Sequence, residues 1–166
     1  KYKTKYFTFS DEAISPNAFN RMSKEILKRG VEMRSLGMLK FESSEKETPE
    51  LFDDIYRAGF LMLFFGLESA NDRILSVIDK GCDQETERAV LKHSSEAGIW
   101  NHLYLFFGFP TEEREEAEDT IKFTIENSEV ESGIIHSVGQ SIFALEKDSA
   151  IYHNPSKFKI DRIIQD

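Results

Sequence analysis

A glycine followed directly by an apolar segment recurs at the ends of three predicted helices, and this junction limits the folds open to the chain. The three pairs are Gly30-Val31, Gly59-Phe60 and Gly98-Ile99. Glycine readily adopts the left-handed conformation that ends a helix, and the apolar residues that follow it are typical of a strand. The chain is therefore expected to repeat a unit in which a helix turns tightly into a strand.

Five strand-like segments alternate with helix-like segments along the chain. The predicted strands cover residues 5–10, 31–41, 60–66, 99–108 and 134–145, and the predicted helices cover 15–30, 48–59, 71–78, 83–98 and 111–128. The segment "FLMLFFG" is apolar on both faces, as in a parallel strand covered by helices. The fold class is α/β, and either a doubly wound sheet or part of a (βα)8 barrel fits this order. A complete eight-stranded barrel needs about 250 residues, more than the 166 present.

Composition narrows the class of protein further. Hydrophobic residues make up 40% and charged residues 31% of the chain, which is ordinary for a soluble single domain. No apolar run approaches the roughly 20 residues that cross a bilayer, so no membrane partner is expected. The single cysteine, Cys82, excludes an internal disulfide and predicts a reducing, cytoplasmic setting. The net charge of 21 − 30 = −9 repels polyanions, so no nucleic-acid partner is expected for this chain.

The chain opens with "KYKTKYFTF", without an initiator methionine, and enters a strand almost at once. We interpret residues 1–166 as one domain that is part of a longer protein, truncated at its amino terminus.

Functional groups of parallel α/β folds gather where strands end and the loops to the next helix begin. Two strand ends run through Phe-Phe-Gly into acidic residues, in "LFFGLES" (63–69) and "LFFGFPTEE" (105–113). The same rule selects the ends of the first two strands. The candidate ligand-binding residues are Ser10, Asp11 and Glu12 after the first strand, Lys40 and Glu42 after the second, Glu68 and Ser69 after the third, and Gly108, Phe109, Pro110 and residues 111–113 after the fourth. Such a rim of backbone groups and carboxylates suits a ligand that carries an ammonium group and ribose hydroxyls.

Each of these residues also has a purely structural interpretation. Glu68 and Ser69 precede a helix and could cap it, Asp11 and Glu12 could do the same, and Lys40 could be a solvated lysine. The phenylalanines could belong to the core. Residue spacing shows no nucleophilic triad, no phosphate-binding glycine loop and no histidine pair at metal-ligand spacing, so no catalytic or metal-binding residue is predicted.

The motifs themselves resemble the radical S-adenosylmethionine (radical SAM) enzymes, in the branch that often carries a cobalamin-binding domain. The resemblance rests on "FSDEAISPNAFNRM" (9–22), "GLESANDRILSVIDKG" (66–81) and "EAGIWNHLYLFFGFPTE" (96–112), in the family's order. It implies a partial, TIM-type (βα)6 barrel, of which the five strands here are the second to the sixth. A 4Fe–4S cluster would be held by a three-cysteine loop upstream of this chain.

The resemblance also implies roles for the candidate residues. Ser10, Asp11 and Glu12 occupy the place of the segment that holds the methionine amino group of S-adenosylmethionine, although the family's glycines are missing. Glu68 and Ser69 match the Glu-Ser pair near the ribose. Phe107, Gly108, Phe109 and Pro110 match the stretch that borders the adenine. Lys40 stands where many relatives have an arginine, which loses bidentate geometry toward a carboxylate.

The chain departs from the family in its cysteines, because a cluster of this type needs thiolate ligands and only Cys82 is present. We expect the chain alone to be catalytically inactive. With the cluster, the full-length enzyme would cleave S-adenosylmethionine to a 5′-deoxyadenosyl radical. The alternative is a non-catalytic α/β binding or interaction module that lacks the cluster. Neither the substrate nor the use of cobalamin follows from the sequence, and the open edge of the sheet is expected to favour self-association.

Overall fold

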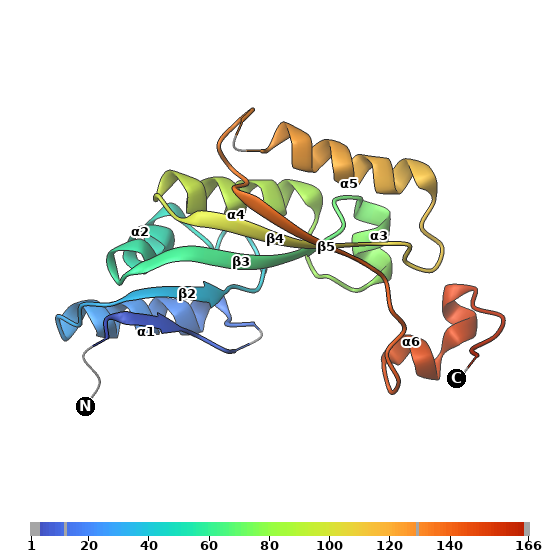
Figure 1. The fold of residues 1–166 in the computed structure, drawn as a ribbon, viewed down its shortest axis with the longest axis horizontal. Helices are drawn as coiled ribbons and strands as arrows, with labels where there is room; N and C mark the ends of the chain where they lie inside the picture. Colours follow the sequence, from blue (N-terminus) through green and yellow to red (C-terminus); the bar gives the residue numbers. More distant parts are fainter. Residues whose placement is uncertain (1–3, 12, 129, 165–166) are drawn as a thin grey trace.

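The computed structural model describes residues 4–11, 13–128 and 130–164 of the chain. Strands and helices alternate over most of this length (Figure 1). The strands are β1 (Tyr6–Thr8), β2 (Arg34–Met38), β3 (Phe60–Glu68), β4 (Trp100–Phe107) and β5 (Ser137–Ile142). The helices are α1 (Pro16–Lys28), α2 (Pro49–Arg57), α3 (Asp72–Val77), α4 (Gln84–Glu96), α5 (Arg114–Glu126), α6 (Ala150–His153) and the 3₁₀ helix η1 (Pro155–Phe158). The predicted α/β order is confirmed, with strand ends that differ by a few residues.

The order of the strands selects between the two architectures that the sequence left open. All five strands are parallel, and each pairs only with its neighbours in the sequence, in the order β1-β2-β3-β4-β5. A doubly wound sheet reverses its strand order at a switch point, and this sheet has none. The sheet is a curled half-barrel of five βα units, as expected for part of a TIM-type barrel.

The two faces of the sheet are buried to very different degrees. Leu63, Phe65 and Leu67 of β3 point toward the helices and are fully buried. Phe64 and Tyr104, on the other face, are only partly covered, and Tyr104 is 40% exposed. The helices α2, α4 and α5 lie along one side of the sheet (Figure 1). The apolar core therefore lies between the sheet and the helices, and the concave face is open.

Side-chain caps explain where the helices begin. Ser15, Thr48 and Asp83 each accept a hydrogen bond from a backbone N–H of the first helical turn, which satisfies a donor that the helix itself cannot pair. Proline follows the cap in α1 and α2, where its missing N–H costs nothing. These capping signals are local in the sequence, and this is why the predicted helix starts agree with the structure.

The carboxyl-terminal part of the chain departs from the βα repeat. After β5 the chain forms the short helices α6 and η1, which lie apart from the sheet beyond the end of β5 (Figure 1). Phe158 of η1 is buried, and its ring meets that of Phe109 edge-on at 6.1 Å. This segment thus packs against the loop that follows β4. Within the described ranges, no helix has the length and apolar character to cross a membrane.

Candidate functional site

The carboxyl ends of the five strands meet at one edge of the half-barrel, and the predicted site residues lie along it. Ser10 and Asp11 follow β1, and both are exposed. Lys40 follows β2 and is also exposed. Its backbone N–H donates to the carbonyl of Ile14 at 3.1 Å, which joins the loops after β1 and β2. Glu12 lies outside the described residues.

Glu68 ends β3 in an unusual backbone conformation. Its φ is +67°, a region that non-glycine residues occupy rarely and at a cost of about 1–2 kcal/mol. The N–H of Ser69 donates to the carbonyl of Leu67 at 2.8 Å, so the turn spans three residues with Glu68 at its centre. This is the pattern of a γ-turn, and a positive central φ belongs to its rare, strained form.

A register shift accompanies this turn. Gly66 pairs with Tyr104 and Glu68 pairs with Leu105, so β3 has one extra residue at its end relative to β4. Such bulges redirect side chains and are common beside functional sites. A capping role alone does not require the turn, because Asn71 is the N-cap of α3 and accepts the bonds from the first turn. The bulge and the turn together leave the Glu68 carboxylate close to Gly66.

Gly66 provides the space into which the Glu68 carboxylate folds. A Cβ atom added to Gly66 would lie 2.6 Å from Oε1 of Glu68 and 3.4 Å from Nζ of Lys80. The carboxylate therefore lies directly over the glycine backbone. Lys80, in the turn after α3, donates from Nζ to the carbonyl oxygen of Gly66 and lies 3.6 Å from Oε1 of Glu68.

Ser69 is placed differently from its neighbour Glu68. Its side chain is fully buried, and its hydroxyl lies 3.1 Å from Oγ1 of Thr120 in α5. The same Thr120 oxygen accepts a hydrogen bond from the N–H of Ala70 at 2.9 Å, and the Ser69 hydroxyl accepts one from the N–H of Asn71. Ser69 thus anchors the β3–α3 turn to α5, and its hydroxyl is already engaged within the protein.

The loop after β4 combines an open glycine with a buried aromatic ring. Gly108 is exposed, and its N–H donates to Oε2 of Glu112 at 2.6 Å. Phe109 is 3% exposed and packs against Phe106 and Phe143 at ring-centroid distances of 5.8 and 5.0 Å. Phe107 and Pro110 are half-buried. Phe109 belongs to an aromatic cluster, so backbone atoms near Gly108 form the accessible part of this stretch.

Three residues at this edge escaped the sequence analysis. Lys80 contacts the end of β3, and Thr120 holds Ser69. Arg73 of α3 forms an ion pair with Glu116 of α5 and donates to the carbonyl of Thr111 at 2.6 Å. Each contact joins residues 14 to 51 positions apart, so no local pattern marks it. Lys80 could have been found only as part of the "DKG" ending of the quoted motif.

Two further titratable groups, one fully buried and one half-buried, lie close to Lys80. Glu87 of α4 is fully buried, and Oε1 accepts a hydrogen bond from Sγ of Cys82 at 3.7 Å. Burial raises the pKa of Glu87 from its ordinary value near 4.5 to about 9, although the ammonium of Lys80 opposes the shift. Burial also raises the pKa of the Cys82 thiol to about 12, with a further contribution from the charge of Glu87. At neutral pH both groups are protonated.

The residues of this chain do not fit an iron–sulfur cluster. Such a cluster needs several thiolates, and the only cysteine, Cys82, is a protonated thiol bound to Glu87. In the part of the chain that the structure describes, no group of three or more His, Cys, Asp or Glu side chains is arranged to hold a metal ion. Cluster chemistry therefore cannot be assigned to these residues.

The concave face carries partly exposed aromatic side chains below this edge. Phe64 and Tyr104 stack at 5.9 Å, and Nδ1 of His102 lies 2.7 Å from the hydroxyl of Ser137. Partial burial lowers the pKa of His102, so its ring is neutral at neutral pH. This histidine is hydrogen-bonded and points to the inside of the half-barrel, and it has no metal partner among the described residues.

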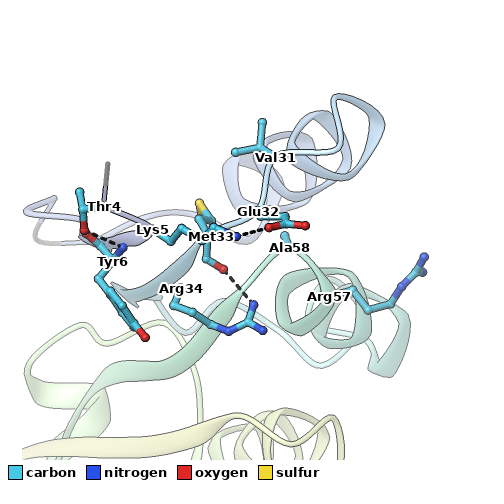
Figure 2. A pocket seen from close by; sticks show the side chains of 9 residues that line it. All are labelled: Thr4, Lys5, Tyr6, Val31, Glu32, Met33, Arg34, Arg57 and Ala58. Atoms are coloured by element: carbon cyan, nitrogen blue, oxygen red, sulfur yellow. Dashed lines mark hydrogen bonds and ion pairs between the residues drawn. The ribbon is translucent and has the colours of Figure 1, made fainter. Parts of the chain in front are cut away.

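A hollow of about 910 Å³ lies at the opposite end of the strands. It is formed at the amino ends of β1 and β2, where Lys5 pairs with Glu32 and Nη1 of Arg34 donates to the carbonyl of Met33 at 3.0 Å (Figure 2). The Lys5, Glu32 and Arg34 side chains are thus engaged with neighbouring residues, and Arg57 pairs with Asp54 of α2. Since active sites of barrel folds lie at the carboxyl ends of strands, we place the candidate site at the edge that contains Glu68.

Comparison with known proteins identifies the family. The sequence matches the radical SAM superfamily over residues 3–124, which is most of the chain. This chain therefore belongs to the radical SAM superfamily, as its motifs indicated. A segment of 61 residues is also 41% identical to "Uncharacterized methyltransferase PH0819" of Pyrococcus horikoshii, and this match covers 37% of the chain and 13% of that protein.

Solved structures share the fold at low sequence identity. OxsB, a cobalamin-dependent S-adenosylmethionine radical enzyme, superposes with a TM-score of 0.64 at 16% identity, over 96% of this chain and 23% of OxsB. The radical S-adenosylmethionine methyltransferase TsrM of Kitasatospora setae gives 0.59 at 15% identity, over 76% and 23%. Coproporphyrinogen III oxidase of Escherichia coli gives 0.57 at 18% identity, over 93% and 35%. The chain thus spans only a small part of the length of each of these proteins.

Proposed function

We propose that this chain is the part of a radical SAM enzyme that binds S-adenosylmethionine along the carboxyl edge of the half-barrel. The observation that carries the proposal is the strained turn at Glu68, which places a carboxylate over Gly66 at the end of the central strand. Strained backbone at the end of a buried strand is typical of functional sites. Membership of the radical SAM superfamily supports S-adenosylmethionine as the ligand.

The side chains at this edge suit the polar groups of that ligand. The carboxylate of Glu68 can accept hydrogen bonds from ribose hydroxyls, and the exposed Asp11 offers a negative charge to the methionine ammonium group. Gly108 leaves backbone atoms accessible after β4. Ser69 contributes indirectly, because its buried hydroxyl fixes the turn that carries Glu68. Lys40, Phe107 and Pro110 remain proposed neighbours of the ligand.

Reductive cleavage of S-adenosylmethionine belongs to the proposal only for a longer protein. When a 4Fe–4S cluster is bound, it supplies the electron for that cleavage, and the one cysteine of this chain cannot ligate it. We therefore assign to these residues the binding and orientation of the ligand. The single cysteine also favours a second candidate, a non-catalytic binding module with the same fold.

The relatives narrow the proposal for the whole protein. The Pyrococcus horikoshii relative is named a methyltransferase, and two structural neighbours depend on cobalamin or bind it. We propose methyl transfer as the reaction class and cobalamin as a second cofactor of the whole protein. The support for cobalamin is the shared fold alone.

Titration calorimetry with S-adenosylmethionine tests the binding role of Glu68. A hydrogen bond to a charged group contributes about 1.5–3 kcal/mol, so Glu68→Gln should raise the dissociation constant about 10- to 100-fold. The matched control is Glu96→Gln, because Glu96 is 60% exposed on α4 and lies in no candidate site. If Glu68→Gln binds as tightly as the unsubstituted chain, the ligand does not rest on this carboxylate. Binding without any cluster-dependent product in the whole protein would favour the non-catalytic module.

A further inference from the structure

Lys80 reaches back from the α3–α4 turn to the end of β3. Its backbone N–H donates to the carbonyl of Leu75 at 3.0 Å, which closes the end of α3. Its side chain is only 18% exposed, and Nζ donates to the carbonyl oxygen of Gly66. The ammonium group is thus fixed by a backbone acceptor that does not depend on Glu68. A lysine held in this way is a rigid charge, unlike the mobile lysines of a protein surface.

The fixed ammonium lies beside the Glu68 carboxylate. Nζ is 3.6 Å from Oε1, and the Glu68 side chain is 32% exposed. Partial burial strengthens such a pair relative to fully exposed pairs, because water screens it less. Lys80 is the only cation within ion-pair distance of Glu68 among the described residues. One oxygen of the carboxylate is thus directed toward Lys80 and Gly66.

We infer that Lys80 is a positioning residue, which holds the Glu68 carboxylate over Gly66 so that a single orientation faces the ligand. This inference rests on the proposed role of Glu68 in binding S-adenosylmethionine. Lys80 acts through Glu68, and its hydrogen bond to the carbonyl of Gly66 anchors the ammonium beside that carboxylate. Preorganised charges bind more tightly because the entropy of ordering them is lost before the ligand arrives.

The groups around Lys80 leave its charge to Glu68. Glu87 lies close to it and is protonated at neutral pH because burial raises its pKa to about 9. Cys82 is protonated as well and donates to Glu87. Asp72 of α3 also faces this cluster, but its Oδ1 accepts a hydrogen bond from the N–H of Gln84 at 2.9 Å. Among the described residues, Glu68 is the only carboxylate within ion-pair distance of the Lys80 ammonium, and the two form a neutral pair.

A double-mutant cycle tests whether Lys80 acts through Glu68. We expect Lys80→Met to raise the dissociation constant for S-adenosylmethionine about 10-fold in calorimetry. In the Glu68→Gln background the same change should have no further effect. Lys80→Arg keeps the charge and should restore part of the affinity. The matched control, Lys92→Met, removes an exposed lysine that pairs with Glu96 on α4 and should leave the constant unchanged.

Each other outcome has a definite meaning. Losses that multiply in the double variant, or unchanged binding by Lys80→Met, would overturn the positioning role. If Glu68→Gln alone has no effect, the proposed function itself fails, and this result is distinct from the first two. If Lys80→Met does not fold, Lys80→Gln takes its place in the cycle, because the glutamine amide can still donate to the Gly66 carbonyl. A ligand-free crystal structure of Lys80→Gln should show the Glu68 carboxylate displaced from Gly66, and an unmoved carboxylate would contradict the inference.

Discussion

At the residue scale, the candidate site depends on Gly66, which has no side chain. Gly66 is followed by a one-residue bulge and by Glu68 in a strained turn. A larger residue at position 66 would occupy the space that the carboxylate fills. The strain at Glu68 costs about 1–2 kcal/mol, and the packing of Leu67 and Ser69 on either side keeps it in place, since both are fully buried.

Gly66→Ala should separate ligand binding from stability. The added methyl group meets the end of a flexible side chain, so the chain should fold with little change in its urea midpoint. The Glu68 carboxylate must move, however, and the dissociation constant for S-adenosylmethionine should rise about 10-fold.

Gly133→Ala is the opposite control. Gly133 has a φ of +72° with open space around it, and it precedes β5 at the amino end of the sheet. This substitution should lower stability and leave binding unchanged. A Gly66→Ala variant that binds normally would show that the carboxylate need not lie over residue 66.

At the element scale, the tight turns from helix to strand differ in the space around their glycines. Gly30 and Gly59 both follow helices and have φ values of +62° and +105°. A Cβ atom at Gly59 would lie 2.1 Å from the carbonyl oxygen of Met33, whereas one at Gly30 would meet nothing within 4 Å. The sequence predicted the same role for both glycines, and only the structure distinguishes them.

This difference predicts unequal costs of two matched substitutions. Gly30→Ala should lower the free energy of unfolding by about 1 kcal/mol, the cost of a left-handed alanine. Gly59→Ala adds a clash with rigid backbone, so it should cost well over about 2 kcal/mol or prevent folding. Urea denaturation of both variants measures the contrast. Equal losses would mean that the backbone at Met33, just before β2, can move aside.

Sequence reasoning succeeded for elements and less well for side-chain placement, and the reason is physical. Capping residues, glycine stops and apolar runs act over a few positions, so the five strands and their succession along the chain could be predicted. These local patterns left open the order of the strands within the sheet, which the structure shows. Ser69 was expected beside the ligand, yet its hydroxyl is bound to Thr120, 51 positions away. Lys80 went unnoticed because its partner, Gly66, presents only a backbone carbonyl. Contacts of this kind follow from the fold and leave no local pattern.

At the scale of the whole molecule, burial of a carboxyl group makes stability depend on pH. The pKa of Glu87 is about 9 in the folded protein and near 4.5 ordinarily. Between pH 4.5 and pH 9 the Glu87 carboxyl group is ionised in the unfolded chain and protonated in the folded protein. Stability from this group is therefore fully present below about pH 4.5 and is lost as the pH rises toward 9. Glu47, whose pKa burial raises to about 7, acts in the same direction over a narrower range.

Glu87→Gln should remove the larger of these two effects. The free energy of unfolding of the variant, relative to the unsubstituted chain, should increase between pH 5 and pH 9 by at most about 1.4 kcal/mol per pH unit. Urea denaturation across this range provides the measurement, with Glu96→Gln on the surface of α4 as the control. A difference that does not change with pH would mean that Glu87 is already ionised in the folded protein.

The sequential strand order has a further consequence, for how the molecule opens. Each strand pairs only with its sequence neighbours, so loss of pairing at one end of the sheet need not disturb the other. β1 has three residues, all exposed, whereas β3 has nine and lies at the middle of the sheet. Amide protons should accordingly exchange with solvent soonest in β1 and latest in β3. Glu68 belongs to β3, the strand expected to exchange last. The edge strands can therefore open by thermal fraying while the Glu68 carboxylate stays in position.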